Sequence, residues 1–536
     1  MALLRLGLMS QIVTYDTTLR DGAQREGVCL SLEDKLRIAT HLDELGVDYI
    51  EGGFLGSNPK ETAFFNAYAS GKLALHHAQL VAFGLPVRKG TAPENDAALK
   101  ELARCSAPVV TLVGKASQRQ VEQTLQVPEE ENLRMIYESI KYLKEQGKRV
   151  FFDAEHYYDG YLENTQYAFE VLVAALEAGA EYLVLADTNG GTLPHQIGTI
   201  TQETALALET ADGQVSLGIH AHDDSGCAVA NTVQAVLSGA QMVQGTVNGY
   251  GERVGNANLL TVLANLELKL GYSTIGLEQL RSLTLTSRLV ADIMNIPHDA
   301  YAPYVGESAF THKGGMHVSA ETRMKDAYQH VDPTKVGNFS HIVMSELAGS
   351  AALEAKAREL GLNIAHLARE KQASILESIK QREAEGYSYE AADASLALLL
   401  EDELGGKPQH FKLESFRVIT ERRPDGGEAT EATIKIHVDE ERFIATAEGN
   451  GPVNALDKAL RTAITRFYPQ IEKLELRDFK VRVLDGSTGT GSVTRVFIET
   501  SDGNESWGTV GVNENIIEAS WDALVDAITY GLMKGV

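Results

Sequence analysis

The sequence predicts an α/β protein: a (βα)8 TIM barrel, then helical subdomains, then a C-terminal α+β domain of duplicated βββα units. Three observations support this. Over about residues 12–271, short apolar runs alternate with longer amphipathic patterns, which is typical of parallel strands covered by helices. The following stretch reads as helical and irregular, and beyond the Gly-Gly-Lys-Pro at 405–408 the hydrophobic period changes to two. We therefore expect domains at 1–285, 286–408 and 409–536.

Eight short apolar runs are predicted to be the barrel strands, at residues 12–16, 49–54, 80–85, 109–114, 150–155, 182–187, 216–222 and 242–247. Eight strand–helix units in about 260 residues match the size of such a barrel. The first helix is expected to begin after Ser31, an N-cap residue with Asp34 three positions on, and to end at Gly46. The alternative is an open doubly wound sheet, but no Gly-X-Gly-X-X-Gly follows the first run.

The C-terminal region alternates apolar and polar residues with the period of antiparallel strands. Three such runs precede a helix near Pro452, and three more precede a second helix that begins near Ile516. This duplicated unit has no acid–base cluster of its own, which favours ligand binding or subunit pairing over chemistry. Ile516, Ile517 and Ala519 are expected to give apolar surface for a ligand beside free N–H groups.

Composition excludes several classes of function. With 48 basic and 74 acidic side chains the net charge is −26, which opposes binding to nucleic acid or to an anionic membrane. The three cysteines, Cys29, Cys105 and Cys227, form no Cys-X-X-Cys pair, as expected in a reducing compartment. The first residues are too short and polar for a signal segment, and no apolar run reaches membrane-spanning length. We expect a cytoplasmic protein.

Polar side chains accumulate where the predicted barrel strands end, which is where such barrels build their active sites. They are Arg20 and Asp21 after the first strand, Asp153 and Glu155 in the fifth, Thr188 after the sixth, His220 and His222 in the seventh, and Asn256 after the eighth. Singly, each is more often a cap or turn residue. Their common position predicts a site.

The sequence His220-Ala221-His222 indicates a metal site. Residues i and i+2 of a strand face the same side, so both imidazoles can reach one cation. An isolated His-X-His is more often structural, but Asp21 and Asn256 add a carboxylate and an amide oxygen. Two nitrogens with hard oxygens suit Mg²⁺, Mn²⁺, Co²⁺ or Zn²⁺.

The segments YDTTLRDGAQ (15–24), GIHAHDDSGCAVANT (218–232) and NGYGERVGNANL (248–259) resemble the family of 2-isopropylmalate, homocitrate and citramalate synthases. The resemblance covers the whole chain. It implies an acyltransferase that joins acetyl-CoA, its co-substrate, to a 2-oxo acid in a metal-dependent Claisen condensation. It also implies a homodimer with a C-terminal regulatory domain.

The same resemblance implies roles for individual residues. Asp21, His220, His222 and Asn256 match the metal ligands. Arg20 matches the group that clamps the oxo acid and stabilises its developing alkoxide, and Thr188 and Asp153 are assigned to substrate binding. Glu155, and His317 and Tyr328 from the helical middle, match groups near the reacting atoms.

Residues 50–61, IEGGFLGSNPKE, resemble the citramalate synthase branch, which favours pyruvate as acceptor and isoleucine as feedback inhibitor. Three alternatives stay open. One is a 2-isopropylmalate synthase, with 2-oxoisovalerate as acceptor in leucine biosynthesis. Another is a lyase such as hydroxymethylglutaryl-CoA lyase, and the third is a non-catalytic amino-acid sensor.

Overall fold

The computed structural model describes residues 11–535 except 57, 210–214, 313–316, 318–319, 321–322, 325, 345–348, 407, 423, 425–427, 439–440, 485–488 and 490. The chain forms two compact units. Unit 1 comprises residues 1–310 and 331–339, and unit 2 comprises residues 311–330 and 340–536.

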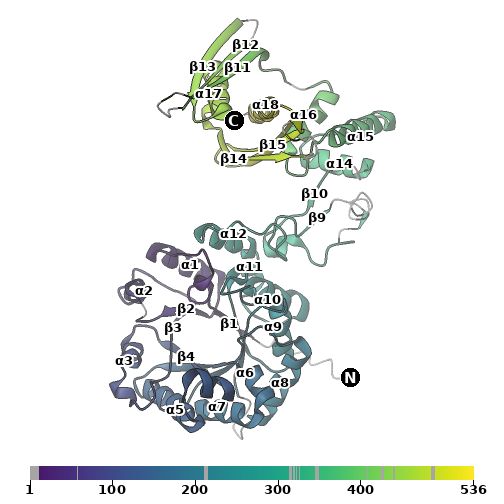
Figure 1. The fold of residues 1–536 in the computed structure, drawn as a ribbon. Coiled ribbons are helices and arrows are strands. Elements are labelled where there is room, and N and C mark those ends of the chain that lie inside the picture. The colour runs from purple at the N-terminus through teal and green to yellow at the C-terminus, as the bar shows by residue number, and fades with distance from the viewer. Residues whose placement is uncertain are drawn as a thin grey trace. The chain divides into compact units, whose positions relative to one another are not determined.

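Unit 1 contains the predicted barrel. In its described residues eight parallel strands close in the order β1 to β8, with β8 pairing back to β1 (Figure 1). The strands are β1 (Val13–Asp16), β2 (Tyr49–Phe54), β3 (Gln79–Gly84), β4 (Val109–Lys115), β5 (Arg149–Glu155), β6 (Tyr182–Asp187), β7 (Leu217–Ala221) and β8 (Met242–Gly245). Each lies within a few residues of its predicted range, so the barrel prediction is confirmed and the open sheet is excluded.

Helices surround the strands (Figure 1). They are α1 (Leu32–Leu45), α2 (Pro59–Ala69), α3 (Ala97–Arg104), α4 (Gln118–Gln120), α5 (Glu129–Glu145), α6 (Tyr157–Glu163), α7 (Thr165–Glu177), α8 (Pro194–Ala207), α9 (Ala228–Leu237), α10 (Leu259–Asn265), α11 (Leu277–Leu280) and α12 (Leu283–Ile293). As predicted, Ser31 and Asp34 form a capping box at the start of α1, and Gly46 ends it in the left-handed conformation. Among the described residues, no helix is both long and apolar enough to cross a membrane.

The barrel interior has two layers that matter for the site. An apolar floor consists of Tyr15, Tyr49, Val81, Val109, Phe151, Val184 and Met242. In a strand, the side chains of residues i and i+2 point to the same side. The next layer toward the carboxyl ends of the strands therefore contains the polar residues Glu51, Thr111, Asp153, His220 and Gln244, all buried. We call these five residues the polar layer.

Unit 2 contains a helical part and the duplicated domain (Figure 1). Its first elements are β9 (Thr311–His312), β10 (His341–Ile342), α14 (Ser350–Glu359), α15 (Arg369–Ala384) and α16 (Asp393–Glu403). The first repeat has β11 (Lys412–Arg422), β12 (Glu428–Val438), β13 (Glu441–Gly449) and α17 (Pro452–Ile464). The second has β14 (Glu475–Val483), β15 (Thr494–Ser501), β16 (Ser506–Asn513) and α18 (Ile516–Lys534). In the described residues each repeat is a three-stranded antiparallel sheet with its helix packed on it, which confirms the duplicated βββα prediction.

The start of α18 differs from the expectation. Ala519 is fully buried in the second repeat beside Val496 and Ile498, so it offers no ligand surface. The side-chain oxygen of Asn515 accepts a hydrogen bond from the N–H of Ile517 at 2.9 Å, so that N–H group is not free. The local reason is that Asn515 is an N-cap residue, and such residues satisfy the first N–H groups of a helix.

Candidate active site

Asp21, His220 and His222 form a buried cluster at the carboxyl ends of the barrel strands. Asp21 follows β1, His220 lies in β7 and His222 directly follows that strand, so closure of the barrel brings them together. His220 Nε2 lies 3.4 Å from Asp21 Oδ2 and 3.4 Å from His222 Nε2. His222 Nε2 lies 3.9 Å from the same carboxylate oxygen. Potential ligand atoms of all three residues lie within 4.8 Å of one another.

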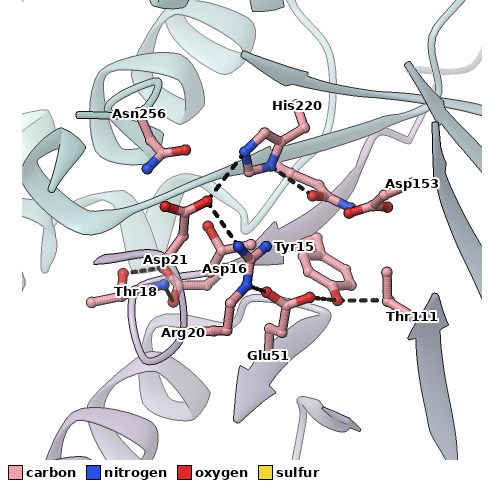
Figure 2. Close-up of polar contacts among 12 residues, drawn as sticks. Tyr15, Asp16, Thr18, Arg20, Asp21, Glu51, Thr111, Asp153, His220 and Asn256 are labelled. Carbon is pink, nitrogen blue, oxygen red and sulfur yellow. Dashed lines mark hydrogen bonds and ion pairs between the residues drawn. The ribbon is translucent and has the colours of Figure 1, made fainter. Parts of the chain in front are cut away.

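Asn256, the fourth predicted ligand, lies beside Asp21 and His220 (Figure 2). Its backbone forms a β-bridge with His222, and its side-chain nitrogen donates to the carbonyl of Tyr250 at 3.1 Å. Its side-chain oxygen is buried and has no hydrogen-bond partner among the described residues. A buried acceptor without a partner costs free energy, and a cation would satisfy it.

The charges of the cluster fit a divalent cation. Burial acts to raise the pKa of Asp21, but Arg20 and the two histidines outweigh it and hold that pKa well below the ordinary range. Burial and the adjacent His220 lower the pKa of His222 to about 4, so its imidazole is neutral near pH 7. An ionised carboxylate, a neutral imidazole and an amide oxygen are the forms in which these groups bind Mg²⁺, Mn²⁺, Co²⁺ or Zn²⁺.

Arg20 is held in one geometry beside the cluster. Its Nε donates to Glu51 Oε2 at 2.6 Å and its Nη1 to Asp21 Oδ2 at 3.0 Å (Figure 2). Its Cζ lies 4.0 Å from the centre of the Phe83 ring. Burial acts to lower the pKa of Arg20, but Glu51 and Asp21 outweigh it and raise that pKa. The result is a fixed cation that can pair with a carboxylate or a developing alkoxide.

Glu51 connects Arg20 with the barrel interior. Its second oxygen accepts a hydrogen bond from the hydroxyl of Tyr15 at 2.7 Å, and that hydroxyl lies 2.8 Å from Thr111 Oγ1 (Figure 2). Each polar atom in this series of hydrogen bonds has a partner, so the buried charge of Glu51 is compensated.

Asp153, Glu155 and Thr188 lie at the same end of the barrel but contact other partners. Asp153 Oδ1 accepts a hydrogen bond from Gln244 at 3.1 Å, and burial raises the pKa of Asp153 to about 7. Glu155 forms an ion pair with Lys115 at 2.6 Å. The hydroxyl of Thr188 accepts a hydrogen bond from the backbone N–H of His156 at 2.8 Å.

His317 and Tyr328 belong to unit 2. Their rings stack with centroids 4.0 Å apart and an interplanar angle of 19°, and both residues are exposed within the described part of the chain. They form a pair in unit 2, and their part in the chemistry stays a prediction.

Three known families match successive parts of the chain. Residues 11–287 match the HMGL-like family, residues 304–386 the homocitrate synthase post-HMGL domain-like family, and residues 390–532 the LeuA allosteric (dimerisation) domain. An (R)-citramalate synthase of Streptomyces coelicolor is 52% identical over 97% of this chain and 96% of its own length. An (R)-citramalate synthase of Aquifex aeolicus is 47% identical over 98% of this chain and 99% of its own length. The chain belongs to the citramalate synthase family.

Membership of the citramalate synthase family makes the chain a condensing acyltransferase rather than a non-catalytic sensor. A 2-isopropylmalate synthase of Methanocaldococcus jannaschii is also related, at 30% identity over 99% of this chain and 97% of that protein. Its lower identity favours the citramalate synthase branch.

Sequence reasoning did not assign roles to four residues of this site. They are Glu51 and Phe83, which hold Arg20, Lys115, which pairs with Glu155, and Gln244, which lies between Asp153 and His220. All four belong to barrel strands: Glu51, Phe83 and Gln244 lie two residues beyond the floor residue of the same strand, and Lys115 lies six residues beyond Val109. That even spacing is a signal that their side chains face the barrel interior, but their partners depend on the register between strands.

Proposed function

We propose that this protein is an (R)-citramalate synthase, which condenses acetyl-CoA with pyruvate and hydrolyses the thioester to release citramalate and CoA. The observation that carries the proposal is the buried Asp21–His220–His222 cluster with Arg20 fixed beside it, in a chain 52% identical to an (R)-citramalate synthase. Asp21, His220, His222 and Asn256 would hold a divalent cation. When bound, such a cation supplies Lewis-acid polarisation of the keto oxygen.

The protein residues have separate tasks in this reaction. A base removes a proton from the acetyl methyl group, and the resulting carbanion attacks the keto carbon of pyruvate, forming a carbon–carbon bond. The keto oxygen gains negative charge and takes up a proton, while Arg20 pairs with that charge. Thr188 and Asp153 are proposed to bind the acceptor, and Glu155, His317 and Tyr328 to serve the proton transfers. Water then cleaves the thioester.

The surroundings of Arg20 support a small acceptor. The Phe83 ring covers its guanidinium, and the Phe54 ring lies against Phe83 with centroids 5.8 Å apart. We propose that the Phe83 ring beside the clamp, backed by Phe54, favours the methyl group of pyruvate over the branched side chain of 2-oxoisovalerate.

The C-terminal domain is proposed to bind isoleucine and to pair two subunits. Its match to the LeuA allosteric (dimerisation) domain supports both ideas. With this role, residues 409–536 form the regulatory domain, 286–408 the helical part and 1–285 the catalytic barrel.

The test is CoA release from acetyl-CoA, followed with a thiol reagent. Pyruvate, 2-oxobutyrate, 2-oxoisovalerate and 2-oxoglutarate are compared with Mn²⁺ present and after chelation. We expect the highest kcat/KM with pyruvate, loss of activity on chelation, and inhibition by isoleucine with leucine and valine as controls. A preference for 2-oxoisovalerate would indicate a 2-isopropylmalate synthase. Full activity after chelation would refute the metal site, and a flat response to all three amino acids would refute the feedback role.

A further inference from the structure

Gln244 lies between a proposed metal ligand and a buried carboxyl group. It belongs to β8, is 1% exposed, and is level with His220 of the neighbouring strand β7 in the sheet register. Its Oε1 lies 2.9 Å from His220 Nδ1, and its Nε2 donates to Asp153 Oδ1 at 3.1 Å. The three residues form a continuous chain across the polar layer.

Asp153 decides which way this amide faces. Above pH 7, where Asp153 is ionised, its carboxylate oxygens only accept hydrogen bonds, so the NH2 group of Gln244 points to Asp153. The amide oxygen then faces His220 and can only accept, so His220 Nδ1 must carry the proton. In a neutral imidazole the other nitrogen is unprotonated. That nitrogen, Nε2, is the atom directed at Asp21 and His222.

We propose that Gln244 is a positioning residue that, with Asp153 behind it, holds His220 in the Nδ1–H form and leaves Nε2 free for the metal ion. The inference rests on the proposed metal site. It also gives Asp153 a task other than binding the acceptor. An amide suits this task because it accepts the Nδ1–H bond without adding a negative charge that would favour protonation of the whole imidazole.

The second histidine provides an internal comparison. His222 Nδ1 is buried and has no hydrogen-bond partner among the described residues. Its tautomer is therefore set only by what its Nε2 meets, whereas that of His220 is set in advance by Gln244. Removal of Gln244 should change His220 and leave His222 as it is.

The experiment compares the full-length metal-free wild type with Gln244→Leu, which keeps the side-chain volume but removes both hydrogen bonds. Tyr158→Phe is the matched control, because the Tyr158 hydroxyl is equally buried and bonds to Thr201 at 2.8 Å, away from the ligands. Binding of Mn²⁺ is measured from the EPR signal of the free ion. We expect the Kd of Gln244→Leu to rise about 10- to 100-fold, and that of Tyr158→Phe to stay unchanged.

The second readout is the tautomer, from two-bond ¹H–¹⁵N correlations of ¹⁵N-histidine in the metal-free proteins. The spectra are recorded at pH 9, because burial acts to lower the pKa of His220 but Asp21 outweighs it and raises that pKa, and a charged imidazole carries a proton on both nitrogens. At that pH the wild type should show His220 as the Nδ1–H form, and Gln244→Leu should show a mixture. If Gln244→Leu does not fold, Gln244→Met fills the same space with a flexible apolar chain and is measured instead. An unchanged Kd and tautomer in the variant would overturn the role of Gln244. Absence of Mn²⁺ binding by the wild type would overturn the proposed metal site itself.

Discussion

The apolar floor of the barrel and the polar layer above it differ in what they do, although four of the five polar-layer residues lie only two positions beyond a floor residue of their own strand. The floor packs aromatic rings such as Tyr49 and Phe151, whose centroids lie 5.1 Å apart at 85°. The polar layer buries carboxyl, imidazole and amide groups whose desolvation is costly unless each is paired. Burial of the floor thus stabilises the barrel. Burial of the polar layer lowers the free energy of unfolding, and its groups are placed for the reaction instead.

The two layers meet at Tyr15. Its ring belongs to the floor, while its hydroxyl bonds to Glu51 and Thr111 of the polar layer (Figure 2). Burial raises the pKa of Tyr15 well above its ordinary value, so the hydroxyl remains a donor at any physiological pH. The comparison predicts that substitutions in the polar layer affect activity more than folding, and substitutions in the floor the reverse.

The largest effect is expected from His220→Ala. Loss of this proposed ligand should lower kcat about ten-thousandfold, because metal polarisation is worth several kcal/mol and each 1.4 kcal/mol is a factor of ten. Circular dichroism and the thermal midpoint should remain close to those of the wild type. If His220→Ala keeps its activity, or if it unfolds, the claim that the polar layer serves activity and the floor serves stability would be contradicted.

Phe151→Ala tests the floor. Truncation of a fully buried ring should lower the free energy of unfolding by about 3–5 kcal/mol, the usual range for Phe→Ala in a core. The kcat per folded molecule should change much less, by under about tenfold. Urea denaturation gives the first quantity and active-site-normalised CoA release the second. A loss of kcat without a loss of stability would contradict the assignment.

Arg20→Lys separates charge from geometry within the site. Lysine keeps the positive charge but cannot make the paired contacts to Glu51 and Asp21 at once. We expect kcat to fall about a hundredfold, the size of effect seen when one oriented donor to a developing oxyanion is removed. Stability should change little. Normal kcat in this variant would mean that Arg20 serves packing alone.

Much of this arrangement could be predicted from the sequence, and what could not has a physical cause. The strands, the His-X-His pair and Asp21 follow from hydrophobic period and from the chemistry of single residue types. The roles of Gln244 and Lys115 do not, because they depend on which residues of neighbouring strands lie side by side in the closed barrel. The pairing of His220 with Gln244 and of Lys115 with Glu155 is such a register property. Glutamine and lysine are common residues, so nothing local distinguishes these two.

The smallest effect is expected from Asp16→Asn. This substitution measures the cost of a buried carboxyl group that has no cationic partner among the residues that the structure describes. Asp16 is fully buried at the end of β1 and accepts hydrogen bonds from the N–H and hydroxyl of Thr18, both at 2.8 Å. Burial outweighs these bonds and raises the pKa of Asp16 to about 7, whereas Asp21 beside Arg20 shows the opposite shift.

The sign of this effect follows from proton binding. Between pH about 4 and pH 7 the folded protein holds a proton on Asp16 that the unfolded chain has released, so stability falls as the pH rises through that window. Asparagine cannot titrate. Its altered bonding to Thr18 gives a constant offset, and the stability of Asp16→Asn relative to wild type should therefore increase from pH 5 to pH 8. Urea midpoints at the two pH values measure the change.

Asp34→Asn is the control. Hydrogen bonds with Ser31 lower the pKa of Asp34, so removal of this carboxyl group should give no gain in stability between pH 5 and pH 8. If the relative stability of Asp16→Asn does not rise with pH, the burial of Asp16 carries no charge cost, and the contrast between Asp16 and Asp21 fails.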